Sequence, residues 1–383
     1  MINVLHRIVV VGCVLALASV AFAQPATKPA TKPATTQASA DFPPITLRDV
    51  AIAPEAALAK IADQTGAILV TDSGTLFNDG QSPAAMLVDV RRQPFWIAMD
   101  QVCRAAHVGV RGLGSGDEQI AIFQSNENKP LWGDRPSYSC GPALFIPEAV
   151  TRTDHRDFFR TKSAEPVANV SVDVWTDPRL KAMSIAGPVR LREAVDEHGH
   201  ALPRDPTDVE QAGGANGAQW SYRMNVRLLL PPNVGKRIAR LRGEVTFVTI
   251  TKRDTFEVKA ADAKGKTQQV LGFPVEIKDL TIGAGGGSVR VGTIRGNADA
   301  AEWGAFLPRF GDIVQQIQLL DEDGMPMRTN GWGSTSSDRF VERSITYVAD
   351  NNDKAKPTKL VWVVPTETRD VTVPFELKDL ILP

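Results

Sequence analysis

Apolar residues at helical spacing occur twice near the start of the chain, between residues 45 and 123. Each run follows a proline, Pro54 or Pro94, placed for the first turn of a helix. Both runs have the spacing i, i+1, i+4, i+5, i+8; they are Ala57, Leu58, Ile61, Ala62, Thr65 and Ala98, Met99, Val102, Cys103, Ala106. Short candidate strands flank them, at 47–50, 67–70, 87–90, 108–110 and 119–123. The pattern predicts a small β-α-β-β-α-β domain over residues 45–125, with two helices on one face of a short sheet.

From about residue 126 the period changes from helical to alternating. The inward positions of three such runs are Val170, Val172, Val174; Tyr222, Met224, Val226, Leu228, Leu230; and Val371, Val373, Phe375, Leu377. Alternation of this kind is typical of half-buried strands in antiparallel sheets. One short helix is expected in this region, over residues 300–306.

The alternating region is also duplicated. Residues 194–199 (AVDEHG) match residues 319–324 (LLDEDG), and each is followed by an alternating strand. A break and a hairpin are then expected in each half, over 241–258 and 359–373. We predict two related antiparallel, Ig-like β-sandwiches, 136–275 and 276–383, in an α+β, multi-domain protein. One larger two-sheet sandwich is the alternative.

The chain begins with a pattern typical of a secretory signal peptide. An apolar stretch follows Arg7, and residues 21–23 (AFA) form a small-x-small cleavage site, so residues 1–23 are expected to be removed after Ala23. The stretch is short for a membrane span, and a lipidated Cys13 would leave apolar residues at the mature N-terminus. Residues 24–44 repeat Pro-Ala-Thr-Lys and predict a solvated linker, whose glycosylation the sequence does not decide. The expected location is extracytoplasmic, periplasmic or secreted, with no transmembrane segment after cleavage.

The order strand, proline, helix, glycine, strand, found at 47–70 and again at 87–110, resembles the short N-terminal domain of secretins and TonB-dependent receptors. The resemblance covers about a fifth of the chain and implies a periplasmic module that docks other proteins or signalling segments. No outer-membrane barrel or secretin pore follows, so export and gating do not carry over. The remainder resembles β-sandwich proteins secreted by bacteria.

Charge and cysteine content narrow the partners. The formal net charge is −1, which provides no positive field for nucleic acid or an anionic membrane. After loss of Cys13 with the signal, Cys103 and Cys140 remain and allow one disulfide. Cys103 lies on the apolar face of a helix, so two buried thiols are the favoured interpretation.

The motifs that contain chemically active residue types have ordinary structural explanations. Asp196-Glu197-His198-Gly199-His200 and Asp321-Glu322-Asp323-Gly324 offer oxygens to Ca²⁺ but lack a bidentate Glu at an EF-hand offset, and Asp-x-x-Gly is also turn chemistry. The glycine-rich run 283–288 has no phosphate-binding lysine after it, and 331–338 lacks a nucleophile elbow. The histidines are scattered: His107, His155, His198 and His200. No metal or cofactor is expected.

The tryptophans raise the question of sugar stacking. Trp132, Trp303 and Trp332 lie in loop-like contexts and are candidates for a ligand platform, whereas Trp175, Trp220 and Trp362 lie in strands and are expected in the core. The favoured function is a non-catalytic, extracytoplasmic binding or scaffold protein with a protein or cell-envelope polymer as partner. A carbohydrate-binding protein and a hydrolase of unrecognised type are the alternatives. The partner's identity and the oligomeric state do not follow from the sequence.

Overall fold

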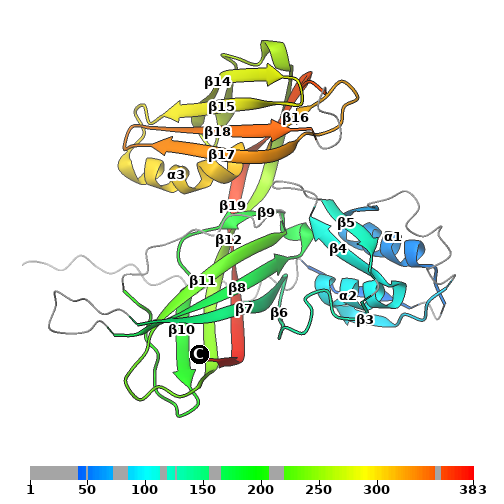
Figure 1. Ribbon diagram of the computed structural model, residues 1–383, viewed down its shortest axis with the longest axis vertical. Coiled ribbons are helices and arrows are strands. Elements are labelled where there is room, and N and C mark those ends of the chain that lie inside the picture. Colours follow the sequence, from blue (N-terminus) through cyan, green and yellow to red (C-terminus); the bar gives the residue numbers. More distant parts are fainter. Residues whose placement is uncertain are drawn as a thin grey trace, which may run out of the picture. The chain divides into compact units, whose positions relative to one another are not determined.

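The computed structural model describes residues 42–48, 51–71, 85–112, 119–125, 127–154, 165–206, 220–349 and 355–383. Within them the protein is an α+β, multi-domain fold dominated by antiparallel sheets, with three α-helices (Figure 1). None of the helices formed by these residues is long and apolar enough to cross a membrane. The expected signal peptide and nearly all of the linker lie outside the described residues.

The N-terminal module has the predicted element order. Its elements are β1 (Ile45–Leu47), α1 (Pro54–Thr65), β2 (Ile68–Thr71), β3 (Val90–Gln93), α2 (Phe95–Ala106), β4 (Val108–Gly112) and β5 (Gln119–Gln124). Helix α1 begins at Pro54 and ends at Gly66, whose φ of 67° suits a glycine cap. The strands form two small sheets, β1-β3 and β2-β5-β4, instead of the single sheet that was expected. The helices and both sheets share one apolar core.

The first β lobe follows. Its elements are β6 (Tyr138–Cys140), β7 (Ala143–Thr153), β8 (Val167–Thr176), the 3-10 helix η1 (Pro178–Leu180), β9 (Ala182–Ile185), β10 (Arg190–Asp196), β11 (Ser221–Leu229) and β12 (Arg237–Lys259). A sheet in the order β11-β8-β7-β6 and a second one that contains β10, β12 and β9 supply the residues of one core.

The second β lobe has its own core. Its elements are η2 (Ala260–Asp262), β13 (Thr267–Val270), β14 (Phe273–Gly283), β15 (Gly286–Ile294), α3 (Ala300–Val314), β16 (Ile317–Leu320), β17 (Arg328–Ser336), β18 (Phe340–Val348) and β19 (Lys359–Ile381). A five-stranded sheet in the order β13-β14-β15-β18-β17 contributes to this core together with α3, β16 and the start of β19. Helix α3 is longer than the expected 300–306; its capping box, Asp299 with Glu302, fixes its start.

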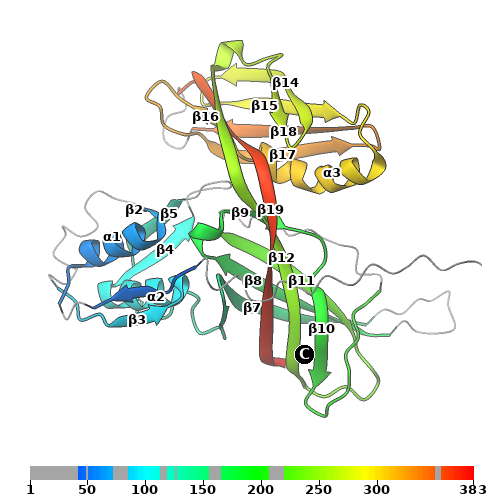
Figure 2. The same cartoon turned by 180° about the vertical axis from the view of Figure 1, so that it is seen from behind.

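Two long strands belong to both lobes. Strands β12 and β19 pair antiparallel from Arg237 opposite Ile381 to Lys259 opposite Lys359, and they lie side by side in both views (Figures 1 and 2). The end of β19 enters the first core, whereas its start enters the second. The boundary expected between residues 275 and 276 therefore falls inside β14, and the lobes are not successive segments. The expected breaks in 241–258 and 359–373 are absorbed by bulges between Ile250 and Arg253, so each segment is one continuous strand.

The duplicated acidic turns have the same backbone design. In the first, the amides of His198 and His200 donate to Asp196 Oδ1 over 2.9 and 2.8 Å. In the second, the amides of Asp323 and Met325 donate to Asp321 Oδ1 over 3.0 and 2.8 Å. The glycines of the two turns, Gly199 and Gly324, adopt φ of 84° and 76°. Each turn follows the strand, β10 or β16, that pairs with the long strand of its own repeat.

Candidate functional site

Three tryptophans join the N-terminal module to the first β lobe. Trp96 begins α2, Trp175 ends β8 and Trp220 precedes β11; the Trp96 ring centroid lies 5.0 Å from that of Trp175 and 4.8 Å from that of Trp220. Trp96 Nε1 donates to the carbonyl of Thr176 over 3.0 Å. Leu144 and Ile146 of β7 belong to the module's core. The module and the lobe therefore share buried apolar surface, which holds the two as one unit.

A cleft of about 390 Å³ opens beside this joint. One wall is the end of α1 and the start of β2, over residues 65–68, and the other is the segment 176–182 that carries η1. Trp220 contributes to the lining. The cleft lies within the usual size range of small-molecule sites and can equally take a few residues of an extended peptide.

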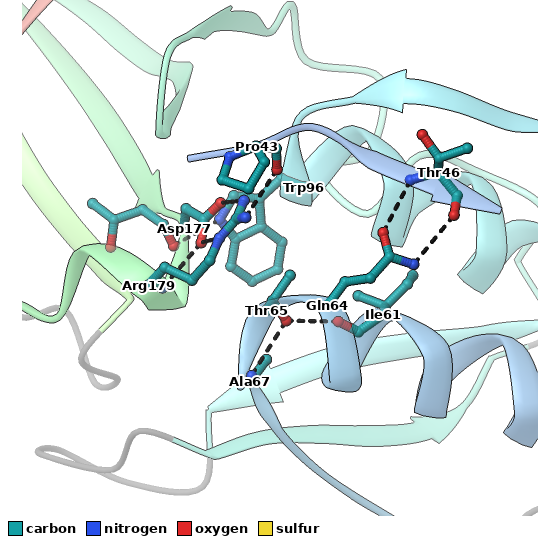
Figure 3. Close-up of polar contacts among 10 residues, drawn as sticks. Pro43, Thr46, Ile61, Gln64, Thr65, Ala67, Trp96, Asp177 and Arg179 are labelled. Atoms are coloured by element: carbon teal, nitrogen blue, oxygen red, sulfur yellow. Dashed lines mark hydrogen bonds and ion pairs between the residues drawn. The ribbon is translucent and has the colours of Figure 1, made fainter. Parts of the chain in front are cut away.

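An ion pair shapes the wall that comes from the β lobe (Figure 3). Arg179 donates from Nε to Asp177 Oδ1 over 2.9 Å and from Nη2 to Oδ2 over 2.5 Å. Its Nη1 donates to the carbonyl of Pro43 over 2.8 Å, and the guanidinium lies 5.8 Å from the Phe42 ring. Only 14% of the Arg179 side chain and 4% of that of Asp177 are exposed, so the fork is preorganised. Arg179 thus fixes the segment that enters the module.

Side-chain hydrogen bonds also fix the opposite wall (Figure 3). Thr65 Oγ1 donates to the carbonyl of Ile61 over 2.7 Å and accepts from the amide of Ala67 over 3.2 Å. Gln64 binds the backbone of Thr46 at both ends of its amide, over 3.2 Å in each case. This two-point contact occupies backbone groups of β1 as a neighbouring strand would. Little rearrangement of these residues is available on binding.

Two side chains remain for an incoming group. Lys181 is exposed, its side chain makes no hydrogen bond or ion pair with other described residues, and its backbone is left-handed, with φ of 47°. Ile68 is 47% exposed although it opens a strand of the module. The cleft therefore offers one cation, one apolar contact and an aromatic lining, while its remaining polar groups bind one another.

The three tryptophans expected to form a stacking platform do not come together. Trp132 is buried in the module's core and Trp303 is 3% exposed in the second lobe's core. Trp332 alone is open, at 64% exposure, on β17. Trp303 lies in α3, within the helix expected over 300–306, and its ring faces the core of the lobe instead of a ligand surface. Trp220 and Trp362, expected in the core, are buried there.

Neither cysteine is in a disulfide. Cys103 is fully buried on α2, and Cys140 is half-buried at the end of β6. Burial raises the pKa of both thiols, which disfavours the reactive thiolate.

The histidines and acidic turns lie away from the cleft's walls. His107 caps α2 in a left-handed conformation, and His155 lies outside the described residues. His200 Nδ1 is 2.9 Å from Asp196 Oδ2, which also accepts from the amide of Gly235. Burial of this carboxylate is outweighed by its donors, which hold the pKa of Asp196 well below its usual range. No group of three or more His, Cys, Asp or Glu in the described part of the chain is placed to hold a metal ion.

No protein-family model, curated protein or solved structure matches this chain. The sequence did contain two signals for the cleft. Gly66 was expected to end a helix, and Asp177-Pro178-Arg179 is a capped turn whose aspartate accepts from the Arg179 amide. Neither signal indicates that the two segments face each other, because their meeting depends on the tryptophan joint between distant parts of the chain.

Proposed function

We propose that the protein is a non-catalytic, extracytoplasmic binding or scaffold protein whose cleft between α1 and η1 receives an extended segment of a protein partner. The signal-like residues 1–23 and the Pro-Ala-Thr-Lys linker support export. The proposal takes residues 45–123 as the kind of docking module that the resemblance to secretin and TonB-receptor N-terminal domains implies.

The observation that carries the proposal is the cleft itself. Its two walls belong to segments more than a hundred residues apart, and the Trp96, Trp175 and Trp220 cluster fixes them beside each other. A rigid, preformed cleft lowers the ordering cost of binding. Ile68 at the first position of β2 offers an apolar contact at the rim, and Lys181 favours a partner segment that carries a carboxylate.

The polar groups of the cleft support a binding role over a catalytic one. Arg179 is committed to Asp177 and Pro43, and Thr65 to Ile61 and Ala67. Hydrolysis needs a base within hydrogen-bond reach of a nucleophile or water, and these groups are held by one another instead. Among the described residues, Trp332 is the one highly exposed aromatic side chain, so a carbohydrate-binding role would rest on that ring.

The test is comparative capture from cell-envelope extract. The tagged mature protein, a Lys181→Glu/Ile68→Asp variant and a Leu87→Asp control would be incubated with the same extract after circular dichroism shows that all are folded. Leu87 is 76% exposed and is not part of the cleft, so the control reports non-specific apolar capture. We expect the cleft variant to lose its protein partner by about tenfold, equivalent to roughly 1.4 kcal/mol, while the control retains it. Equal capture by all three proteins would contradict the proposal.

A further inference from the structure

Strand β17 is a long strand at the edge of its sheet, and only its first residue, Arg328, is charged. It has nine residues, Arg328–Ser336, and each of them is at least partly exposed. In the described part of the chain, β18 is the only strand that pairs with it. Residues 329–337 (TNGWGSTSS) contain no charged residue and no proline. Its one bulge, between Thr329 and Gly331, lies near one end, so Gly331–Ser336 forms a regular edge.

Other long strands with an open side carry the features that prevent edge-to-edge pairing. The second half of β12 has Lys252, Arg253 and Asp254 in succession, and β7 has Pro147 followed by Glu148. Strand β11 is covered by a neighbouring segment, since the amide of Asp205 donates to the carbonyl of Arg227. Proteins usually protect sheet edges with charge, proline or coverage. The regular part of β17 contains no charge and no proline, and no other strand of the described residues covers it, which indicates an edge that is kept available for pairing.

Trp332 makes this edge apolar and well ordered. Trp332 is 64% exposed, and the guanidinium of Arg343, a residue of β18, lies 4.4 Å from the centroid of its ring. Arg343 is itself only 8% exposed, so it supports one face of the ring from within the lobe. The other parts of the ring remain available to a neighbouring strand, where aromatic cross-strand contacts are favourable.

We propose that β17 pairs antiparallel with β17 of a second copy of this chain. In an antiparallel pair, facing residues alternate along the strands between hydrogen-bonded and non-hydrogen-bonded pairs, so both members of a facing pair must be of the same type. The two-fold axis of a symmetric pair must therefore lie at a residue that faces the same residue of the other copy. Axes at Gly333 and at Ser334 each pair five residues of the regular edge, and we place the axis at Ser334 because this register lies further from the bulge. Gly333 then faces Thr335, and Trp332 faces Ser336, in both directions. The described part of the chain contains one such edge, and pairing uses it in both copies, so the assembly stops at a dimer.

Charge supports a second copy as the occupant. Residues 331–337 carry no charge, so two copies meet without like-charge repulsion. The proposal is separate from the proposed function, because β17 contributes no residue to the cleft.

The test uses single cysteines in the full mature chain. Ser334→Cys places two thiols at facing positions across the axis, within disulfide range, whereas Thr335→Cys places them two residues apart and out of range. Under mild oxidation we expect a covalent dimer for Ser334→Cys, and none for Thr335→Cys or for the wild type, whose Cys103 is buried and whose Cys140 is half-buried. Cross-linking at both engineered positions, or at neither, would overturn the register.

Sedimentation measures the association without a cross-link. We expect wild-type protein to reach twice the chain mass and no more as its concentration rises. Ser334→Lys should raise the dissociation constant about tenfold, because it opposes like charges at the axis. The matched control is Gln269→Lys, an exposed position on β13 at the other edge of the same sheet, which should leave the constant unchanged. A monomer at every soluble concentration, or equal effects of the two lysines, would refute the proposal.

Discussion

The two β repeats share one design for their turns and long strands but fill their cores differently. In the first repeat the three-residue η1 precedes β9 and β10, whereas in the second the fifteen-residue α3 precedes β16. Leu241 of β12 faces Ala194, and Leu360 of β19 faces Leu319, so the two leucines occupy equivalent positions in the two repeats. Two residues further along each long strand, Gly243 of the first repeat corresponds to Trp362 of the second. The Trp362 indole is fully buried and donates to the carbonyl of Ile313 in α3. The strand pattern thus determines the skeleton, and the inserted segment determines how large the core residues must be.

The largest loss of stability is expected from truncating Trp362, the large core side chain that the second repeat has where the first has Gly243. Trp362→Ala should lower the free energy of unfolding by about 3–5 kcal/mol, because it opens a cavity against α3 and leaves the Ile313 carbonyl without this donor. Urea denaturation would measure the change. Trp332→Ala, studied at low protein concentration, is the matched control and should stay within about 0.5 kcal/mol. Similar losses from both variants would show that α3 does not depend on Trp362.

The two acidic turns share a backbone design but differ in how deeply their aspartate is buried. The Asp196 side chain is fully buried and accepts from Gly235, His198 and His200, whereas Asp321 is only partly buried. Asp196→Asn replaces an acceptor by an amide that opposes these donors and should cost about 3 kcal/mol at pH 7, against about 1 kcal/mol for Asp321→Asn. Equal costs would remove the distinction between the turns.

The pH dependence of stability provides a second comparison of Asp196 with Asp321. Because the pKa of Asp196 is lowered in the folded protein, its stabilisation is fully present above the unfolded value of about 3.9 and is lost as the pH falls further. The difference in unfolding free energy between the wild type and Asp196→Asn should therefore narrow below about pH 4. The same series with Asp321→Asn is the control for general acid unfolding.

Gly243, which occupies the position equivalent to Trp362 in the first repeat, should not tolerate the methyl group of alanine without a loss of stability. A Cβ on Gly243 would lie 2.7 Å from the Phe375 ring and 2.8 Å from the carbonyl oxygen of Arg190. Gly243→Ala should thus cost about 1–3 kcal/mol through overpacking. Gly331→Ala, whose Cβ meets no atom within 4 Å, is the control, and thermal unfolding compares the two. A neutral Gly243→Ala would mean that Phe375 moves aside freely.

A buried carboxyl in the second repeat should behave in the opposite way to Asp196. Burial raises the pKa of Asp312 on α3 to about 7, although the Arg343 charge and a hydrogen bond from Ser184 act in the other direction. Between about pH 4 and pH 7 the unfolded chain loses this proton first, so the carboxyl destabilises the fold as pH rises. Asp312→Asn should stabilise the protein by about 1–2 kcal/mol at pH 8 and by much less at pH 4. A loss of stability at pH 8 would contradict this.

The smallest effect concerns a feature common to both repeats. Tyr222 on β11 and Tyr347 on β18 are buried, and their hydroxyls donate to the carbonyls of Ala182 and Ile317 over 2.6 and 2.7 Å. Each tyrosine thereby ties one sheet to the segment opposite. Tyr222→Phe and Tyr347→Phe should each cost about 1 kcal/mol, measured by urea denaturation. A markedly larger cost in one repeat would show that the two ties are not equivalent.

The sequence was informative wherever local chemistry decides the structure. Proline at the helix starts, glycine after α1 and the alternation in β8, β11 and β19 predicted these elements, and the Asp-x-x-Gly runs predicted the matching turns. It was uninformative where distant segments meet. The pairing of Arg237 with Ile381 and the contact between Trp96 and Trp220 depend on tertiary packing, which no period of 2 or 3.6 residues encodes. The cleft depends on that packing and so could not be predicted either.

The strands shared by the lobes also set the order of folding. Val373, Phe375 and Leu377, from the last part of β19, are fully or almost fully buried in the first lobe's core. That core therefore lacks one of its strands until residues 371–377 have been synthesised. Pairing across such long sequence separations is intrinsically slow. The emerging chain must thus keep an incomplete first sheet from aggregating until these residues arrive, and a chain truncated after residue 370 would leave the first lobe without this strand.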